Sequence, residues 1–297
     1  MTLARFEERE YERPLYAELQ VAHNRLWSPG QVLEGRFGLD TTFFSPVAFP
    51  YQIYGSVPPP GVILSRYTHF FRHELHAPPR RKLPNYLLNV FLQAKRPRYL
   101  RKAAKDITAK GLNGAHWAFA LDSEQQLILE KLEAKFTGKV ITTYASPTFH
   151  TEMALYRHTI GGSVANNSTF PAPSLLKGHK HWHYKKPGAS GVAKSEPVAI
   201  DGVSLEERIA GLPDGATESG SAGDDWVRNL QLLSVGIREV MEDDELPESF
   251  RRSQYFTLIR EISAYMERVE DAPQWISPFL KITTFVSNYR MAWFVVG

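Results

Sequence analysis

Four polar residues, Glu34, Asp40, Gln93 and Lys95, have the side-chain types that hydrolytic chemistry at a metal ion requires. Gln93 and Lys95 end an apolar run over residues 86–95, which is typical of a central strand. Because side chains alternate along a strand, both residues lie on one face of it. A lysine among apolar neighbours needs an anionic partner, and this requirement directs attention to the acids of the sequence.

Asp40 is the main candidate for that partner, because the sequence has one other acid, Glu74, between Asp40 and Lys95. Carboxylate and amide oxygens are the ligands that Mg²⁺ prefers. A bound metal acidifies the attacking water and offsets charge on phosphate oxygens. A neighbouring lysine orients that water or stabilises the charge on the transferring phosphate. The set therefore predicts metal-assisted hydrolysis of a phosphodiester.

The distribution of charge favours a polyanionic substrate. Residues 66–110 contain twelve Lys or Arg against two acids, whereas residues 201–271 contain seventeen acids against seven Arg. Neutralisation of phosphates dominates affinity for nucleic acids, so a basic segment around the Gln-x-Lys strand suits DNA. We expect phosphate contacts from the basic residues that follow this strand, namely Arg96, Arg98, Arg101 and Lys102.

Hydrophobic periodicity and capping residues predict a mixed α/β core in the first half of the chain. The expected helices cover residues 3–23, with Pro14 kinking or dividing the helix, 28–37, which carries Glu34, and 124–136. The expected strands cover residues 39–44, 86–95, 117–121 and 139–145.

The second half of the chain differs in character. Residues 150–223 are rich in Gly, His and Pro, and we expect an irregular extension and linker there. Residues 224–297 contain two amphipathic patterns and a last apolar element, which predict a mainly helical C-terminal module. The expected organisation is therefore a core over 1–149, an extension over 150–223 and a helical module over 224–297. The helices of that module are the candidate surface for a second copy of the chain or for a partner protein.

The order of these elements resembles the core of the PD-(D/E)XK nuclease superfamily, the restriction-endonuclease-like fold, over roughly residues 1–147. Members of that superfamily carry an Asp on one strand and [Asp/Glu/Gln]-x-Lys on the next, which Asp40, Gln93 and Lys95 match. Many also have a Glu on the preceding helix, matched by Glu34. Some have a Gln on the helix after the Lys strand, matched by Gln125 or by Gln126, which we take as the candidate.

The resemblance implies a Mg²⁺- or Mn²⁺-dependent nuclease acting on DNA, with bacterial defence against foreign DNA as a possible setting. In that interpretation, Glu34 and Asp40 bind the metal and Gln93 completes the site through its carbonyl oxygen. Lys95 positions the attacking water, and Gln126 belongs to the same catalytic set. The long interval between Asp40 and Gln93 implies an insertion in the core.

Two alternatives from other classes stay open. In the first, the chain is a non-catalytic nucleic-acid-binding or assembly protein, and Gln93 and Lys95 are structural. In the second, His179, His181 and His183 alternate on a strand and form the centre of a metallohydrolase.

Composition excludes several other classes. The chain has 297 residues with 43% hydrophobic residues and no cysteine, which excludes disulfides, thiolate metal sites and a cysteine nucleophile. No apolar run approaches the ~20 residues that span a bilayer, and the N-terminus lacks the apolar stretch of a signal peptide. We therefore expect a cytoplasmic protein with no membrane partner.

Overall fold

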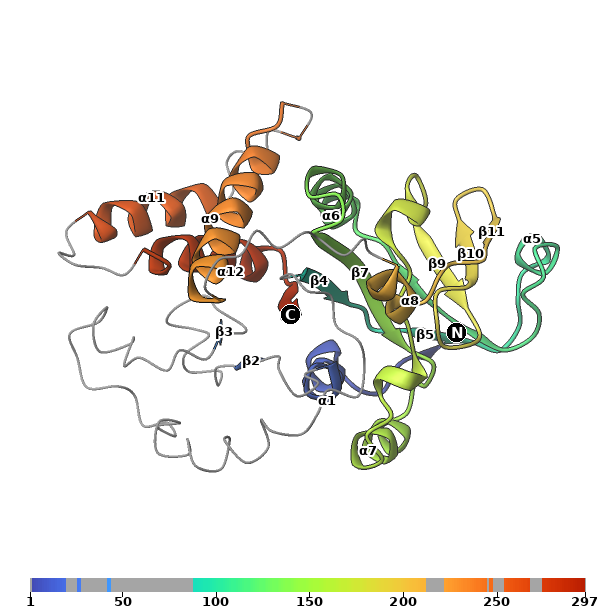
Figure 1. The fold of residues 1–297 in the computed structure, drawn as a ribbon. Coiled ribbons are helices and arrows are strands. Elements are labelled where there is room, and N and C mark those ends of the chain that lie inside the picture. Colours follow the sequence, from blue (N-terminus) through green and yellow to red (C-terminus); the bar gives the residue numbers. More distant parts are fainter. Residues whose placement is uncertain are drawn as a thin grey trace.

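The computed structural model describes residues 2–19, 88–211, 222–244, 246–247, 254–267 and 274–296, together with two short strands at 26–27 and 42–43 (Figure 1). Its helices are α1 (Glu8–Leu19), α5 (Lys105–Thr108), α6 (Ser123–Lys135), α7 (Glu152–Ile160), η2 (Ala165–Asn167), η3 (Pro173–Leu176), α8 (Leu205–Ala210), α9 (Ala222–Met241), α11 (Gln254–Met266) and α12 (Ile276–Asn288). Its strands are β1 (Thr2–Leu3), β2 (Leu26–Trp27), β3 (Thr42–Phe43), β4 (Leu88–Ala94), β5 (Arg98–Leu100), β6 (His116–Ala120), β7 (Val140–Pro147), β8 (Ser168–Thr169), β9 (His181–Tyr184), β10 (Gly191–Lys194), β11 (Val198–Ile200) and β12 (Ala292–Val296).

A four-stranded mixed sheet contains β4, the strand that ends just before Lys95. Its order is β12-β4-β7-β8, with β4 and β7 parallel and the two outer pairs antiparallel. All seven residues of β4 are buried, as its nearly unbroken apolar sequence predicts for a central strand. The last strand of the chain therefore pairs with the strand that precedes Lys95.

The two faces of β4 pack into different hydrophobic clusters, as the alternation of its side chains predicts. Val90 and Leu92 lie in a cluster with Tyr11 and Leu15 of α1. Phe91 lies in the other, with residues of α6, α9 and α12. Phe91 therefore lies on the opposite face of β4 from Val90 and Leu92, as the predicted alternation requires. Figure 1 shows α1 on one side of β4 and β7 and α6 on the other.

A six-stranded antiparallel sheet, in the order β1-β5-β6-β9-β10-β11, packs beside the first. Its inner face carries aromatic side chains, and the ring of Phe119 lies 5.7 Å from that of Tyr144 on β7. Residues that pair directly across the strands share a face, so His183 lies in line with Ala118 and Arg98 on the outer face.

Several expected elements are present with shifted bounds. The expected helix 3–23 is α1, Glu8–Leu19, and it continues through Pro14. The strands expected at 86–95, 117–121 and 139–145 are β4, β6 and β7. In the helix expected at 124–136, α6, the side chain of Asp122 accepts hydrogen bonds from the first turn and fixes its start. Of the strand expected at 39–44, the structure describes Thr42–Phe43 as β3, and the helix expected at 28–37 lies outside the described residues.

The segment 150–223, expected to be irregular, instead holds a helix at each end, α7 and α8, with strands β8 to β11 between them. These strands have two to four residues each, which is too short to produce a clear alternating pattern in the sequence. One hydrophobic cluster takes residues from all three expected segments, including Phe91, Trp182 and Phe285. The domain boundaries stay a prediction.

The described residues form a mixed α/β fold whose C-terminal part is mainly helical, as expected. None of the helices in this part of the chain is long and apolar enough to cross a membrane.

Candidate active site

Lys95 follows the last residue of β4 and is held by a glutamine from α6. Its Nζ donates a hydrogen bond of 2.6 Å to Oε1 of Gln125 and lies 5.7 Å from the centre of the Tyr144 ring. Burial lowers the pKa of Lys95, while the negative charges of Glu8 and Asp122 raise it and the charge of Arg290 lowers it. Asp40, the partner expected for this lysine, lies outside the described residues, and the described hydrogen-bond partner is the neutral amide of Gln125.

Gln93 is a deeply buried polar side chain of this region, with 1% of its surface exposed. Its Nε2 donates to the carbonyl oxygen of Ala94 at 3.1 Å, whereas its Oε1 is buried and accepts no hydrogen bond from the described residues. Leaving a buried carbonyl oxygen unpaired costs roughly 1–3 kcal/mol. An oxygen of this kind, two residues before a lysine, is suited to a hard cation such as Mg²⁺.

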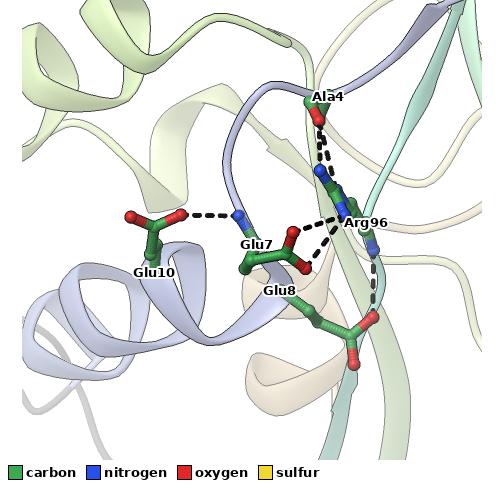
Figure 2. Close-up of polar contacts among 5 residues, drawn as sticks. All are labelled: Ala4, Glu7, Glu8, Glu10 and Arg96. Carbon is green, nitrogen blue, oxygen red and sulfur yellow. Dashed lines mark hydrogen bonds and ion pairs between the residues drawn. The ribbon is translucent and has the colours of Figure 1, made fainter.

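Glu8, the first residue of α1, supplies a carboxylate beside Lys95. Its Oε2 accepts a hydrogen bond of 3.1 Å from the backbone N–H of Arg96. Burial raises the pKa of Glu8, and the positive charges of Lys95, Arg290 and Arg96 oppose that effect, as does this hydrogen bond. Figure 2 shows the carboxylate of Glu8 turned toward the backbone at Arg96.

The sequence interpretation did not include Glu8, although a signal for it exists. Glu8 stands in line with Tyr11 and Leu15 at helical spacing, and both of those residues are fully buried. An acid on the apolar stripe of a helix needs a polar partner in the interior, and here the partner is the chain just after β4.

Arg96 is held by the N-terminal segment, as Figure 2 shows. Its guanidinium donates to the carbonyl oxygen of Ala4 through Nε at 3.1 Å and Nη2 at 2.6 Å. Its Nη1 donates to both carboxylate oxygens of Glu7, at 2.8 and 2.9 Å. These bonds fix the end of β4 against α1. Arg98, Arg101 and Lys102 are exposed. The phosphate contacts expected of all four stay a prediction.

The two glutamines at the start of α6 have different environments, and Gln125 is the one that reaches Lys95. Its Nε2 also donates to the backbone carbonyl of Tyr289 at 3.2 Å. Gln126 is buried: it accepts from the Tyr144 hydroxyl at 2.8 Å and donates to Glu130 and to the carbonyl of Pro173. Successive residues of a helix differ by about 100° in direction, which separates the two. Gln125, and not the expected Gln126, is therefore the glutamine that contacts Lys95, while the catalytic role expected of Gln126 stays a prediction.

Glu34 and Asp40, the expected metal ligands, lie outside the described residues. Within the part of the chain that the structure describes, no group of three or more His, Asp or Glu residues is arranged to hold a metal ion. Of the described oxygen atoms, Gln125 Oε1 accepts from Lys95, and the carboxylates of Glu8 and Asp122 act on its charge; Gln93 lies two residues earlier in the chain. Metal binding by Glu34 and Asp40 remains a prediction. Gln93 and Glu8 would be additional oxygen ligands.

The three alternating histidines do not form one cluster with each other. His181 and His183 lie on the outer face of β9, but His179 precedes that strand. His183 Nδ1 instead lies 3.1 Å from Nε2 of His116, whose Nδ1 lies 3.0 Å from the carbonyl oxygen of Gly114. His116 and His183 thus form a buried pair of imidazole rings, and the contact of His116 with the Gly114 carbonyl holds the pair in place.

No protein-family model, curated protein or solved structure matches this chain in the comparisons with known proteins. The chemistry of the site therefore has to be argued from its own residues.

Proposed function

We propose that this chain is a Mg²⁺- or Mn²⁺-dependent nuclease that hydrolyses phosphodiester bonds in DNA, built on a restriction-endonuclease-like core. One observation carries the proposal. A half-buried lysine, Lys95, is held by Gln125 at the end of β4, two residues after Gln93, whose buried amide oxygen has no hydrogen-bond partner in the described part of the chain. A fixed ammonium beside an unpaired oxygen suits the reaction of a phosphate at a divalent metal.

The order of elements around the site supports this interpretation. A helix that carries an acid, α1 with Glu8, comes before the strand that carries Gln93 and leads to Lys95. After β5, α5 and β6, the helix α6 supplies Gln125. These elements are part of the order that the resemblance implies, and Glu8 is a further candidate beside Glu34 for the acid of the first helix. The described part of the strand expected to carry Asp40, β3, pairs with β2 in a separate sheet.

The donor set fits a hard divalent cation in part. Gln93 would offer a neutral oxygen and Glu8 a carboxylate, and Glu34 and Asp40 are the further carboxylates expected from the sequence. When bound, such an ion acidifies a water molecule and neutralises charge on the phosphate. Gln93 would hold its oxygen in place through the bond from its own Nε2 to the Ala94 carbonyl.

Lys95 would act on the attacking water and the phosphate. Its ammonium has three N–H donors, of which Gln125 takes one, so two remain for a water molecule and a phosphate oxygen. Gln125 would keep the ammonium in one position, which reduces the reorganisation needed during the reaction. The exposed Arg98, Arg101 and Lys102 would add phosphate contacts beyond the site.

The test is cleavage of supercoiled plasmid and linear duplex DNA with Mg²⁺ or Mn²⁺, with EDTA as the metal-free control. Lys95→Ala should reduce the rate by about 100-fold or more, the usual loss when a charge-stabilising donor is removed. The matched control is Lys139→Ala, because Lys139 is exposed just before β7, at the opposite end of the parallel β4–β7 pair. That variant should cut like the wild type, and circular dichroism should show that both variants are folded.

Two results would contradict the proposal. DNA binding by the wild type without cleavage by either metal would favour the non-catalytic nucleic-acid-binding alternative. Metal-dependent cleavage that survives Lys95→Ala would move the active site elsewhere, and His181 and His183 would be the next residues to test.

A further inference from the structure

The turn that ends α12 holds an arginine in a backbone conformation that favours glycine. Arg290 has a φ of 52° and is the only residue other than glycine with a positive φ in the described part of the chain. The N–H of Met291 donates to the carbonyl of Val286, and that of Arg290 to the carbonyl of Ser287. This is the Schellman ending of a helix, in which the left-handed position is usually Gly. The backbone alone therefore gives no reason for arginine here.

Gln125 ties this turn to Lys95. Its side-chain oxygen accepts from Lys95, and its side-chain nitrogen donates to the carbonyl of Tyr289, the residue before Arg290. One amide group thus fixes the position of the turn relative to the ammonium. Strand pairing also fixes the position of the turn, since Ala292 lies opposite Leu92 in the β12–β4 ladder. Arg290 lies two residues before Ala292 and therefore beside the end of β4.

The positive charge of Arg290 acts on both Lys95 and Glu8. Arg290 is exposed, and its positive charge lowers the pKa of both Glu8 and Lys95. No hydrogen bond or ion pair holds its guanidinium among the residues that the structure describes. Arg290 therefore adds a positive charge near Lys95 and Glu8 that no described residue pairs with through a hydrogen bond or ion pair, and such a charge suits an anion.

We propose that Arg290 binds the phosphodiester at this site, donating to its non-bridging oxygens while Lys95 faces the reacting phosphorus and water. The inference rests on the proposed function and extends it, because it assigns to the C-terminal part of the chain a direct contact with the substrate. A guanidinium can donate two parallel hydrogen bonds to a phosphate, whereas a lysine presents a point charge. This contact would explain why an arginine occupies a position whose backbone conformation favours glycine.

The test uses substitutions that move stability and activity in opposite directions. Arg290→Gly removes the side chain and relieves the left-handed backbone, so the melting temperature should rise. Its DNA cleavage should fall by about 10- to 100-fold, the loss expected for one phosphate donor. Arg290→Lys keeps the charge and the backbone strain and should retain more activity than Arg290→Gly. The matched control is Arg157→Ala, because Arg157 is exposed on α7 and should have no effect.

Binding separates this inference from the proposed function. The probe is a fluorescent DNA duplex of about 20 base pairs, measured by anisotropy in EDTA over a series of salt concentrations. Arg290→Gly should weaken binding and reduce the slope of log affinity against log salt by about one, which a structural role would not do. Unchanged binding and cleavage in Arg290→Gly would overturn the inference and leave the nuclease proposal standing. An uncut plasmid with the wild type, together with weaker binding by Arg290→Gly, would overturn the nuclease proposal and support the phosphate contact.

Discussion

Lys95 and Gln125 are 30 residues apart in sequence, and the ammonium of the one lies 2.6 Å from the side-chain oxygen of the other. The bond joins the end of β4 to the first turn of α6. A second bond from the same amide reaches the carbonyl of Tyr289, so Gln125 fixes Lys95 and the last helical turn together. The position of the ammonium therefore depends on three separate stretches of chain.

Gln125→Leu removes both bonds while keeping the size of the side chain. We expect cleavage to fall by about 10- to 100-fold, mainly through kcat, because Lys95 loses the group that holds it. The free energy of unfolding should fall by only about 1–2 kcal/mol, since two half-buried hydrogen bonds are lost. Steady-state cleavage kinetics and urea denaturation measure the two effects.

Gln126→Leu is the matched comparison, and we expect it to lose stability while keeping its cleavage activity. Gln126 is buried and satisfies the Tyr144 hydroxyl and the Pro173 carbonyl, so its loss should cost about 2–4 kcal/mol. Cleavage per folded molecule should stay close to that of the wild type. A larger loss of activity in Gln126→Leu than in Gln125→Leu would contradict the assignment of Gln125 to the site.

Gln93→Leu tests the unpaired oxygen. The substitution removes an unsatisfied buried oxygen, so the metal-free protein should be at least as stable as the wild type. Mg²⁺ should raise the melting temperature of the wild type, as binding to the folded state requires, but should do so less for the variant. Gln93→Glu, which gives the same position a carboxylate, should increase the metal-dependent rise. Equal responses to Mg²⁺ in all three proteins would exclude Gln93 as a ligand.

The buried pair His116–His183 predicts a loss of stability in mild acid. Burial lowers the pKa of His183 from 6.5 to about 4, helped by the charges of His116, Lys194 and His181 and opposed by that of Asp106. Between these two pKa values the unfolded chain binds a proton that the folded chain does not. The free energy of unfolding should therefore fall as the pH drops from about 6.5 to about 4, by the order of 2–3 kcal/mol from this residue.

Urea denaturation across this pH range measures the effect, and His183→Gln should make the fall smaller because glutamine does not titrate. NMR titration of the His183 ring gives its pKa directly. A ring that titrates near 6.5 in the folded protein would be incompatible with the buried pair.

We expect Asn89 to stabilise the fold and to have no role in catalysis. Its Oδ1 accepts from Trp293 Nε1 of β12 at 3.0 Å, and its Nδ2 donates to Asn229 of α9 at 2.9 Å. Asn89→Ala removes two buried side-chain hydrogen bonds, those to Trp293 and to Asn229, so the free energy of unfolding should fall by about 2–4 kcal/mol. Asn113→Ala, at an exposed position, should change it by less than about 0.5 kcal/mol.

The sequence predicted the parts of the site that depend on local pattern. The alternation along residues 86–95 correctly placed Phe91, Gln93 and Lys95 on one face, because a buried strand has a strict period of two. The start of α6 followed from the cap that Asp122 forms. These features depend on interactions within a few residues, which is why pattern alone predicts them.

The rest of the site depends on contacts between distant segments, which no local pattern encodes. Helical spacing places Glu8 in line with Tyr11 and Leu15, but its partner, the backbone N–H of Arg96, lies 88 residues away in the sequence. The choice between Gln125 and Gln126 required the rotation of α6 about its axis. Arg290 could not be assigned because its turn meets Gln125 across 164 positions of sequence.

The pairing of β12 with β4 has a consequence for the time at which the site is assembled during synthesis. A ribosome produces Gln93, Lys95 and Gln125 long before it produces Arg290 and the strand that begins at Ala292. The antiparallel neighbour of β4 and the turn at Tyr289 are both missing until that point. A nascent chain would therefore hold the lysine without its complete surroundings, and the site would be complete only after β12 has left the ribosome and paired with β4.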